Sequence, residues 1–383
     1  MDVVLVCPQL NTLGGIQRVV IELARKFNPV IYTAHYAPEF TYPQLREFDI
    51  RVLRRSGAER ALFPADSYRY GSLRFLRTKL RDDYDVISAH NAPAEFIRLR
   101  NPRVCWTLYA PLRQAYDLYQ WNMSRMGTGG RLLNGLAMGA YRLADSALVP
   151  RIEKICPISE VVDLRLRKYL KRTDGEVVHI GINPSEFSCG SYGDYFLYVS
   201  RFAPNKRFEY AIEAFRIFTS LARREKNGTA VKKLVLAGFA RSPDEPYLKK
   251  LRSLAAGLPI EFLLNPDEKA VRELYAGCYA TLFSALDEDY GLVPLEAMAS
   301  RKPCVSVREG GPLYTIADGQ TGFLVGSPEE MARRMLELAS DRSLAERMGK
   351  AGRKRVLERF TMEAYLRKME KAFRDAAAAN DRG

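Results

Sequence analysis

The sequence contains few of the residues that build disulfide frameworks or metal centres. Among its 383 residues are six cysteines and three histidines, and no two cysteines form a Cys-x-x-Cys pair. The cysteines are scattered and mostly lie in apolar settings, which predicts reduced core residues in a cytosolic protein. The histidines are too few and too dispersed to indicate a metal cluster. A disulfide-stapled domain and a zinc site are therefore not expected.

Long hydrophobic runs are also absent. No stretch of eighteen or more apolar residues occurs, so no transmembrane helix is predicted. The first residues, MDVVLVCPQL, carry no basic leader and lead straight into a strand-like run, which argues against a signal peptide. The chain is longer than one hydrophobic core usually holds, so we expect two domains.

Charge of one sign is in clear excess, since the formal net charge is +14 at pH 7. Basic chains bind nucleic acids, anionic membrane surfaces or anionic substrates. The excess is densest in residues 51–81, where nine cations accompany two acids: Arg51, Arg54, Arg55, Arg60, Arg69, Arg74, Arg77, Lys79 and Arg81 against Glu59 and Asp66. This segment is interpreted either as a solvated surface that keeps the protein soluble or as a patch that contacts anionic lipid headgroups.

Short apolar runs alternate with helical patterns along the chain, which predicts an α/β fold with parallel sheets. The first run, residues 3–7, precedes Gly14 and Gly15 and then a helix, and paired glycines there let a ligand approach the backbone. Another strand, residues 83–90, ends at His90. Ligands of open α/β sheets bind at the carboxyl ends of strands, so His90 is a candidate site residue. The alternative is a histidine that makes a local hydrogen bond.

Residues 283–325 contain a pattern suited to a nucleotide sugar. Glu288 and Glu296 are separated by seven residues, and Tyr290-Gly291 between them is a loop-like pair before a predicted helix. A helix N-terminus offers unbonded N–H groups and partial positive charge to a phosphate. The two carboxylates can accept hydrogen bonds from hydroxyl groups on either side. A solvated acidic loop before a core helix is the simpler alternative.

Two cations stand at another predicted strand-to-helix turn. A strand over residues 196–200 leads to Arg201, and Lys206 follows five residues later, just before a helix. Such a pair suits a diphosphate, because the guanidinium can make two parallel hydrogen bonds to it. The alternative is a pair of ordinary surface cations in a basic protein.

Taken together, these motifs resemble the donor-site signature of the retaining glycosyltransferases of family 4. The resemblance is carried by E-x-Y-G-x-x-x-x-E from Glu288, the EAMA helix, RKPCVSV, the Gly310-Gly311-Pro312 run and DGQTGFLV. It is strong over residues 195–326 and weak before them. It implies a GT-B fold with two Rossmann-like βαβ domains that face each other across a cleft. The implied boundaries are residues 1–187 with a returning C-terminal helix, 361–383, for the acceptor side and 188–360 for the donor side.

The resemblance also implies roles for individual residues. Arg201 and Lys206 would bind the donor diphosphate and stabilise its leaving charge, Glu288 would contact the sugar, and Glu296 would hold the ribose. His90 would lie near the reacting sugar. The expected catalytic residues are His90, Arg201, Lys206 and Glu288, and the expected donor-binding residues are Gly14, Gly15, Gly238, Tyr290, Gly291, Leu292, Val293 and Glu296.

The expected reaction is retaining transfer of a hexose, mannose or glucose, from a GDP- or UDP-linked donor. The acceptor would be a saccharide or a lipid-linked saccharide, with the protein in the cytoplasm or on the cytoplasmic face of a membrane that residues 51–81 contact. No cofactor and no metal are expected, because cations already serve the diphosphate. The alternatives are a basic nucleic-acid-binding protein, for which no fingerprint is present, and a non-catalytic scaffold of the same family.

The stretch from Tyr116 to Met138 leaves two interpretations open. It is rich in aromatic residues and methionine and is interrupted by Gly-Thr-Gly-Gly at 127–130. It forms either an acceptor-side or membrane-facing element or a part of the core.

Overall fold

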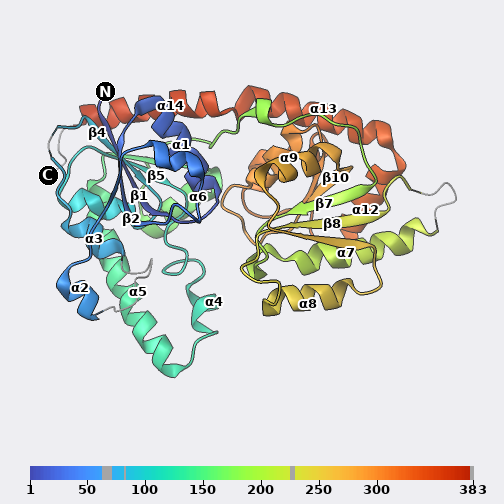
Figure 1. Ribbon diagram of the computed structural model, residues 1–383, viewed down its shortest axis with the longest axis horizontal. Helices are drawn as coiled ribbons and strands as arrows, with labels where there is room; N and C mark the ends of the chain where they lie inside the picture. Colours follow the sequence, from blue (N-terminus) through green and yellow to red (C-terminus); the bar gives the residue numbers. More distant parts are fainter. Residues whose placement is uncertain (63–70, 82, 225–228, 380–383) are drawn as a thin grey trace. The chain divides into compact units, whose positions relative to one another are not determined.

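Two parallel β-sheets of six strands organise the protein. The computed structural model describes residues 1–62, 71–81, 83–224 and 229–379. The chain divides into two compact units, Met1–Ile180 with Tyr365–Gly383, and Gly181–Ala364. Each unit holds one sheet with helices packed around it (Figure 1). The α/β class predicted from the alternating patterns is confirmed.

The sheet of the first unit has the strand order β3-β2-β1-β4-β5-β6, and its pairings are parallel. Its strands are β1 (Val3–Leu10), β2 (Val30–Tyr36), β3 (Ile50–Val52), β4 (Val86–His90), β5 (Val104–Leu108) and β6 (Lys154–Pro157). Its helices are α1 (Gly15–Phe27), α2 (Gly57–Leu62), α3 (Gly71–Arg77), α4 (Tyr119–Met123), α5 (Thr128–Leu148), α6 (Glu160–Arg165) and α14 (Met362–Ala378). Every residue of β4 and β5 is buried, as expected for strands of a parallel sheet covered on both faces.

The sheet of the second unit has the order β12-β11-β10-β7-β8-β9 and is also parallel. Its strands are β7 (Tyr195–Val199), β8 (Lys233–Gly238), β9 (Ile260–Leu264), β10 (Ala280–Phe283), β11 (Cys304–Val307) and β12 (Gly322–Val325). Its helices are α7 (Phe208–Ala222), α8 (Pro246–Ala255), α9 (Glu268–Gly277), α10 (Leu292–Ala299), α11 (Pro312–Thr315), α12 (Pro328–Ser340) and α13 (Arg342–Arg359). Strands β7 and β10 are neighbours, so the two motifs that follow them meet at one edge of this sheet.

The C-terminal helix α14 returns to the first unit, as predicted. The ring of Phe373 lies 5.3 Å from that of Phe27, edge to face. Along the helix, Glu370 pairs with Lys26 at 2.6 Å and Asp375 pairs with Lys154 at 3.2 Å. These contacts bring the last helix onto the unit formed by the first 180 residues.

Across the residues described here, no helix combines the length and the hydrophobicity that a membrane span requires.

Two buried carboxyl groups connect α5 to the core of the first unit. Tyr116 donates a hydrogen bond to Asp145 at 2.9 Å, and Tyr141 donates one to Glu95 at 2.7 Å. Burial raises the pKa of Glu95 well above its ordinary value, and the nearby Asp145 raises it further. Burial also raises the pKa of Asp145, to about 7. At neutral pH the pair therefore retains protons that both groups would lose in the unfolded chain.

This pair predicts that stability falls as pH rises. A carboxyl whose folded pKa lies above its unfolded value of 3.8 binds more protons when folded, so its stabilisation is complete below pH 4 and is lost by about pH 7. Asp145 alone should lower the free energy of unfolding by about 2 kcal/mol between pH 5 and pH 7, and Glu95, whose pKa is also raised, should add to the fall. Asp145→Asn should flatten this dependence in denaturant titrations. An Asp145→Asn profile parallel to that of the wild type would contradict the assignment.

Candidate functional site

The turn between β10 and α10 has the geometry that the sequence predicted. Gly291 precedes the first residue of α10 with a φ of 91°, a left-handed conformation that glycine adopts readily. Pro294 lies in the first turn of the helix, where its missing N–H has no intrahelical partner. Glu288 is in the loop before the helix, and Glu296 is about one turn inside it. Tyr290 is buried between them.

Lys206 and Glu288 are in direct contact. The Lys206 ammonium donates a hydrogen bond to Glu288 Oε2 at 2.6 Å. The lysine ends a short 3-10 turn after β7, and the hydroxyl of buried Tyr198 donates to its carbonyl oxygen. The adjacent backbone is joined as well, because the N–H of Leu286 donates to Asn205 O at 2.8 Å. The two motifs, 82 residues apart in sequence, thus form one cluster.

Arg207 also stabilises this cluster, and no sequence pattern pointed to it. Its backbone has a φ of 48°, and its guanidinium donates to Ser284 O at 2.6 Å and to Glu309 Oε2 at 2.9 Å. Glu309 also accepts from the N–H of Asp287 at 3.3 Å. In the sequence Arg207 resembles an ordinary cation at the start of a helix. Its contact with the carbonyl oxygens that follow β10 is seen only in the folded structure.

Gly310 and Gly311 support the loop that carries Glu288. The N–H of Gly311 donates to Glu288 O at 2.7 Å. Gly310 has a φ of 63°, and a Cβ atom there would lie 2.4 Å from Glu288 O. At Gly311 a Cβ atom would lie 2.1 Å from Tyr290 O. The backbone of one loop therefore packs on the other with no room for a side chain.

Gly311→Ala should therefore lower the free energy of unfolding by roughly 2–4 kcal/mol, because the backbone of the loop must move. Gly139→Ala is a matched control, since no atom lies within 4 Å of the added methyl group and alanine favours a helix interior. That control should raise the melting temperature slightly. Thermal denaturation of both variants measures the difference, and equal melting temperatures would refute the packing argument.

Glu296 is buried and oriented by a residue outside the predicted site. The hydroxyl of Tyr275 donates to Glu296 Oε2 at 2.8 Å, and Tyr275 itself is fully buried on α9. Sequence reasoning missed Tyr275 because an aromatic residue in an amphipathic helix predicts only core packing. This hydrogen bond fixes the carboxylate within the first turns of α10.

Arg201 lies after β7, and its side chain is exposed. Within the described part of the chain it forms no ion pair. Gly238 ends the neighbouring strand β8, and a Cβ atom there would lie 1.6 Å from Ser200 O, so only glycine fits. Residues Leu292 and Val293, at the start of α10, are partly exposed. All of these residues belong to the second unit.

The remaining predicted residues lie in the first unit. Gly14 is the N-cap of α1, Gly15 begins that helix, and both follow the end of β1. His90 ends β4 and is fully buried, with Ser88 Oγ 2.8 Å from Nε2 and Tyr109 Oη 3.3 Å from Nδ1. Burial lowers the pKa of His90 to about 3, so its ring is neutral near pH 7. The local hydrogen bonds named as the alternative are present, and a role toward the sugar stays a prediction.

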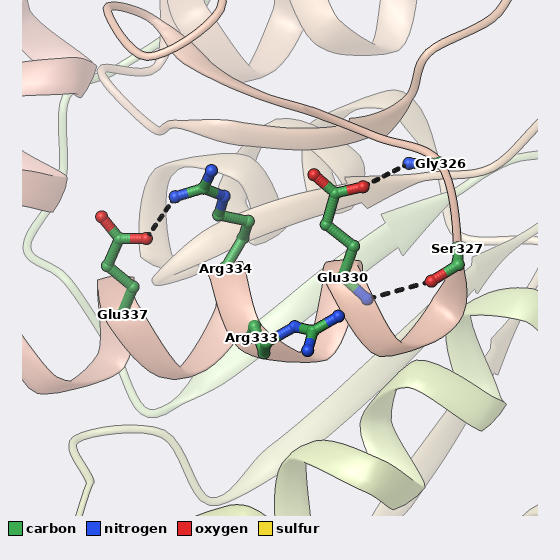
Figure 2. A pocket seen from close by; sticks show the side chains of 6 residues that line it. All are labelled: Gly326, Ser327, Glu330, Arg333, Arg334 and Glu337. Atoms are coloured by element: carbon green, nitrogen blue, oxygen red, sulfur yellow. Dashed lines mark hydrogen bonds and ion pairs between the residues drawn. The ribbon is translucent and has the colours of Figure 1, made fainter.

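A hollow beside the N-terminus of α12 is lined by residues that cap this helix (Figure 2). The Ser327 hydroxyl accepts from the N–H of Glu330 at 3.2 Å, and Glu330 Oε2 accepts from the N–H of Gly326 at 2.7 Å. The two bonds cap the N-terminus of α12 in the manner of a capping box, although the carboxylate bonds to the residue before the N-cap. No residue of the predicted site lines this hollow.

The basic segment 51–81 is partly internal. Arg74 is buried and donates to Glu59 at 2.8 Å, and Arg77 donates to the same carboxylate at 3.0 Å. Arg51 pairs with Asp49 at 2.7 Å. Arg69 and Asp66 lie outside the described residues. Arg74 and Arg77 therefore bind a buried carboxylate inside the first unit, whereas Arg51 and Asp49 form an exposed pair.

Comparison with known proteins agrees with this geometry. The family described as "Glycosyl transferases group 1" matches residues 191–355, which contain the Lys206–Glu288 cluster and α10. The chain is similar to this family over that segment, which is less than half of its length. The resemblance to family 4 glycosyltransferases is thereby confirmed at the level of the group.

Curated relatives match about half of the chain. The alpha-1,3/1,6-mannosyltransferase ALG2 of Dictyostelium discoideum is 27% identical over 186 residues, which cover 46% of this chain and 44% of that protein. N-acetyl-alpha-D-glucosaminyl L-malate synthase of Bacillus anthracis is 31% identical over 194 residues, covering 49% of this chain and 47% of that protein. Each match thus spans less than half the length of the relative.

Solved structures share the fold over nearly the whole chain. Sucrose-phosphate synthase from Thermosynechococcus elongatus has a TM-score of 0.75 at 18% identity and covers 99% of this chain and 100% of that one. HepE from Anabaena, solved with UDP and glucose, has a TM-score of 0.74 at 17% identity and covers 98% of this chain and 99% of that one. The predicted GT-B fold is confirmed.

Proposed function

We propose that the protein is a retaining glycosyltransferase that moves a hexose from a nucleotide diphosphate sugar to a saccharide or lipid-linked acceptor. The observation that carries this proposal is the 2.6 Å contact between Lys206 and Glu288 beside the N-terminus of α10. A cation, a carboxylate and a set of helix N–H groups meet at the adjacent carboxyl ends of β7 and β10. The cation and the N–H groups suit a phosphate, and the carboxylates suit the hydroxyl groups of the sugar and the ribose.

Each residue has a role in the proposed transfer. Lys206, Arg201 and the N–H groups at the start of α10 stabilise negative charge on the departing nucleoside diphosphate, which is electrostatic catalysis. Glu288 accepts hydrogen bonds from sugar hydroxyls, and Glu296 accepts them from the ribose. Gly238, Tyr290, Gly291, Leu292 and Val293 shape the donor site. Gly14, Gly15 and His90 are proposed contacts to the sugar.

The donor sugar and nucleotide are proposed by similarity. Relatives named as mannosyltransferases favour mannose, and the neighbour solved with UDP and glucose favours a UDP-linked glucose, so GDP and UDP are both candidates. Because cations serve the diphosphate, we propose transfer that is independent of divalent metal.

The protein is proposed to act in the cytoplasm or on the cytoplasmic face of a membrane. All six cysteines are thiols, five of them buried, as expected for a reducing compartment. The net charge of +14 favours an anionic surface or substrate. Nucleic acid is not the expected partner.

Calorimetric titration with GDP, UDP and ADP, each with and without magnesium, tests the proposal. One nucleoside diphosphate should bind without magnesium, and Arg201→Ala should weaken that binding at least tenfold. Binding of none, together with salt-sensitive binding of RNA or DNA, would replace the proposal with the nucleic-acid alternative. If binding and turnover required magnesium, only the proposed independence of divalent metal would be wrong.

A further inference from the structure

Helix α5 presents an apolar face to solvent. Its leucines Leu132, Leu133, Leu136 and Leu143 are 67%, 71%, 66% and 72% exposed. With about 100° of rotation per residue, the four side chains fall within an arc of about 100° on one side of the helix. Scattered exposed leucines are common on protein surfaces, but a contiguous row marks an interaction site.

The opposite face of the same helix is well packed. Asn134, Met138 and Asp145 are buried there. Helix α4 contributes to this packing, because the Arg142 guanidinium lies 4.7 Å from the ring of Tyr119 and the Asn134 amide contacts the Met123 sulfur at 3.5 Å. The helix runs well beyond the sheet of its unit (Figure 1). The leucine row is therefore held in a defined place on a folded helix.

The charged residues of the segment that carries the leucine row are all basic. Residues 118–144 contain no Asp or Glu and three arginines, Arg125, Arg131 and Arg142. Arg125 is exposed, and its guanidinium lies 3.6 Å from the ring centre of Trp121, whereas Arg131 and Arg142 lie on the packed side of α5. Leucine, tryptophan and arginine without acids are the composition of helices that lie in the plane of an anionic membrane surface.

We infer that the leucine row of α5 inserts into the headgroup region of an anionic lipid bilayer, with Arg125 contacting lipid phosphates. The inference rests on the membrane location proposed above and assigns it to α4 and α5.

Co-sedimentation with vesicles tests the inference without any need for turnover. The wild-type protein should bind vesicles of phosphatidylcholine and phosphatidylglycerol, and bind pure phosphatidylcholine vesicles far more weakly. Leu132→Asp combined with Leu136→Asp should lower the partition coefficient at least about tenfold. Leu357→Asp on α13 is the matched control, since Leu357 is 53% exposed and should leave binding unchanged.

Three outcomes would overturn the inference: no binding of the wild type to anionic vesicles, equal binding of the leucine variant, or an equal loss in the Leu357→Asp control. A wild-type dimer that the leucine variant dissociates, with vesicle binding unaffected, would assign the face to a protein contact. Nucleoside diphosphate binding, measured on the same samples, separates these results from the proposed activity. A leucine variant that no longer binds vesicles but still binds the nucleoside diphosphate supports the inference, whichever donor the enzyme uses.

Discussion

Replacing Lys206 with alanine should lower kcat for donor consumption by roughly 100- to 1,000-fold, which is the effect of losing one preorganised charge at a transition state. The lysine is held by a 2.6 Å contact with Glu288 and by the hydrogen bond from Tyr198 to its carbonyl. Its side chain is 12% exposed, so its charge acts in a poorly hydrated setting. Release of nucleoside diphosphate from the nucleotide sugar measures the change without knowledge of the acceptor.

Glu288→Gln provides the matched comparison for this prediction. The amide keeps the shape of the carboxylate but no longer neutralises Lys206. Nucleoside diphosphate should therefore bind Glu288→Gln at least as tightly as the wild type, whereas Lys206→Ala should bind it more weakly. Turnover should fall in both variants. Equal changes in affinity for the two substitutions would show that the pair is structural and does not contact the donor.

The donor side of the site could be predicted from the sequence because its parts are local. A glycine with positive φ, a proline in a first helical turn and a carboxylate on each side are properties of consecutive residues, and β10 and α10 place them as expected. The alternation of apolar runs and helices predicted the parallel sheets, but it did not predict the order of their strands. The contact between Lys206 and Glu288 then follows from the pairing of β7 with β10.

Other features could not be predicted because they depend on tertiary contacts. Arg74 counted as a surface cation, yet it is buried against Glu59, since the partner that lowers the cost of burial lies 15 residues away. Arg207 and Tyr275 each reach an atom on another element, Ser284 O and Glu296 Oε2. No pattern of neighbouring residues indicates such long-range hydrogen bonds.

Glu296→Gln should weaken the binding of nucleoside diphosphate by about 10- to 100-fold, because a hydrogen bond to a charged carboxylate contributes about 1.5–3 kcal/mol. The carboxylate is 7% exposed and is oriented by Tyr275. The amide fits the same space, so the fold should be unaffected. Calorimetric titration of wild type and variant gives the ratio of the dissociation constants.

A ligand lacking both ribose hydroxyls separates a direct contact from an indirect one. If Glu296 accepts hydrogen bonds from the ribose, the wild type should bind the dideoxy nucleotide about as weakly as Glu296→Gln binds the normal one. The variant should lose little more when the hydroxyls are removed, so the two changes are not additive. Tyr275→Phe, which removes only the hydrogen bond to the carboxylate, should give a smaller loss. Additive penalties would place the ribose elsewhere and leave Glu296 with a structural role on α10.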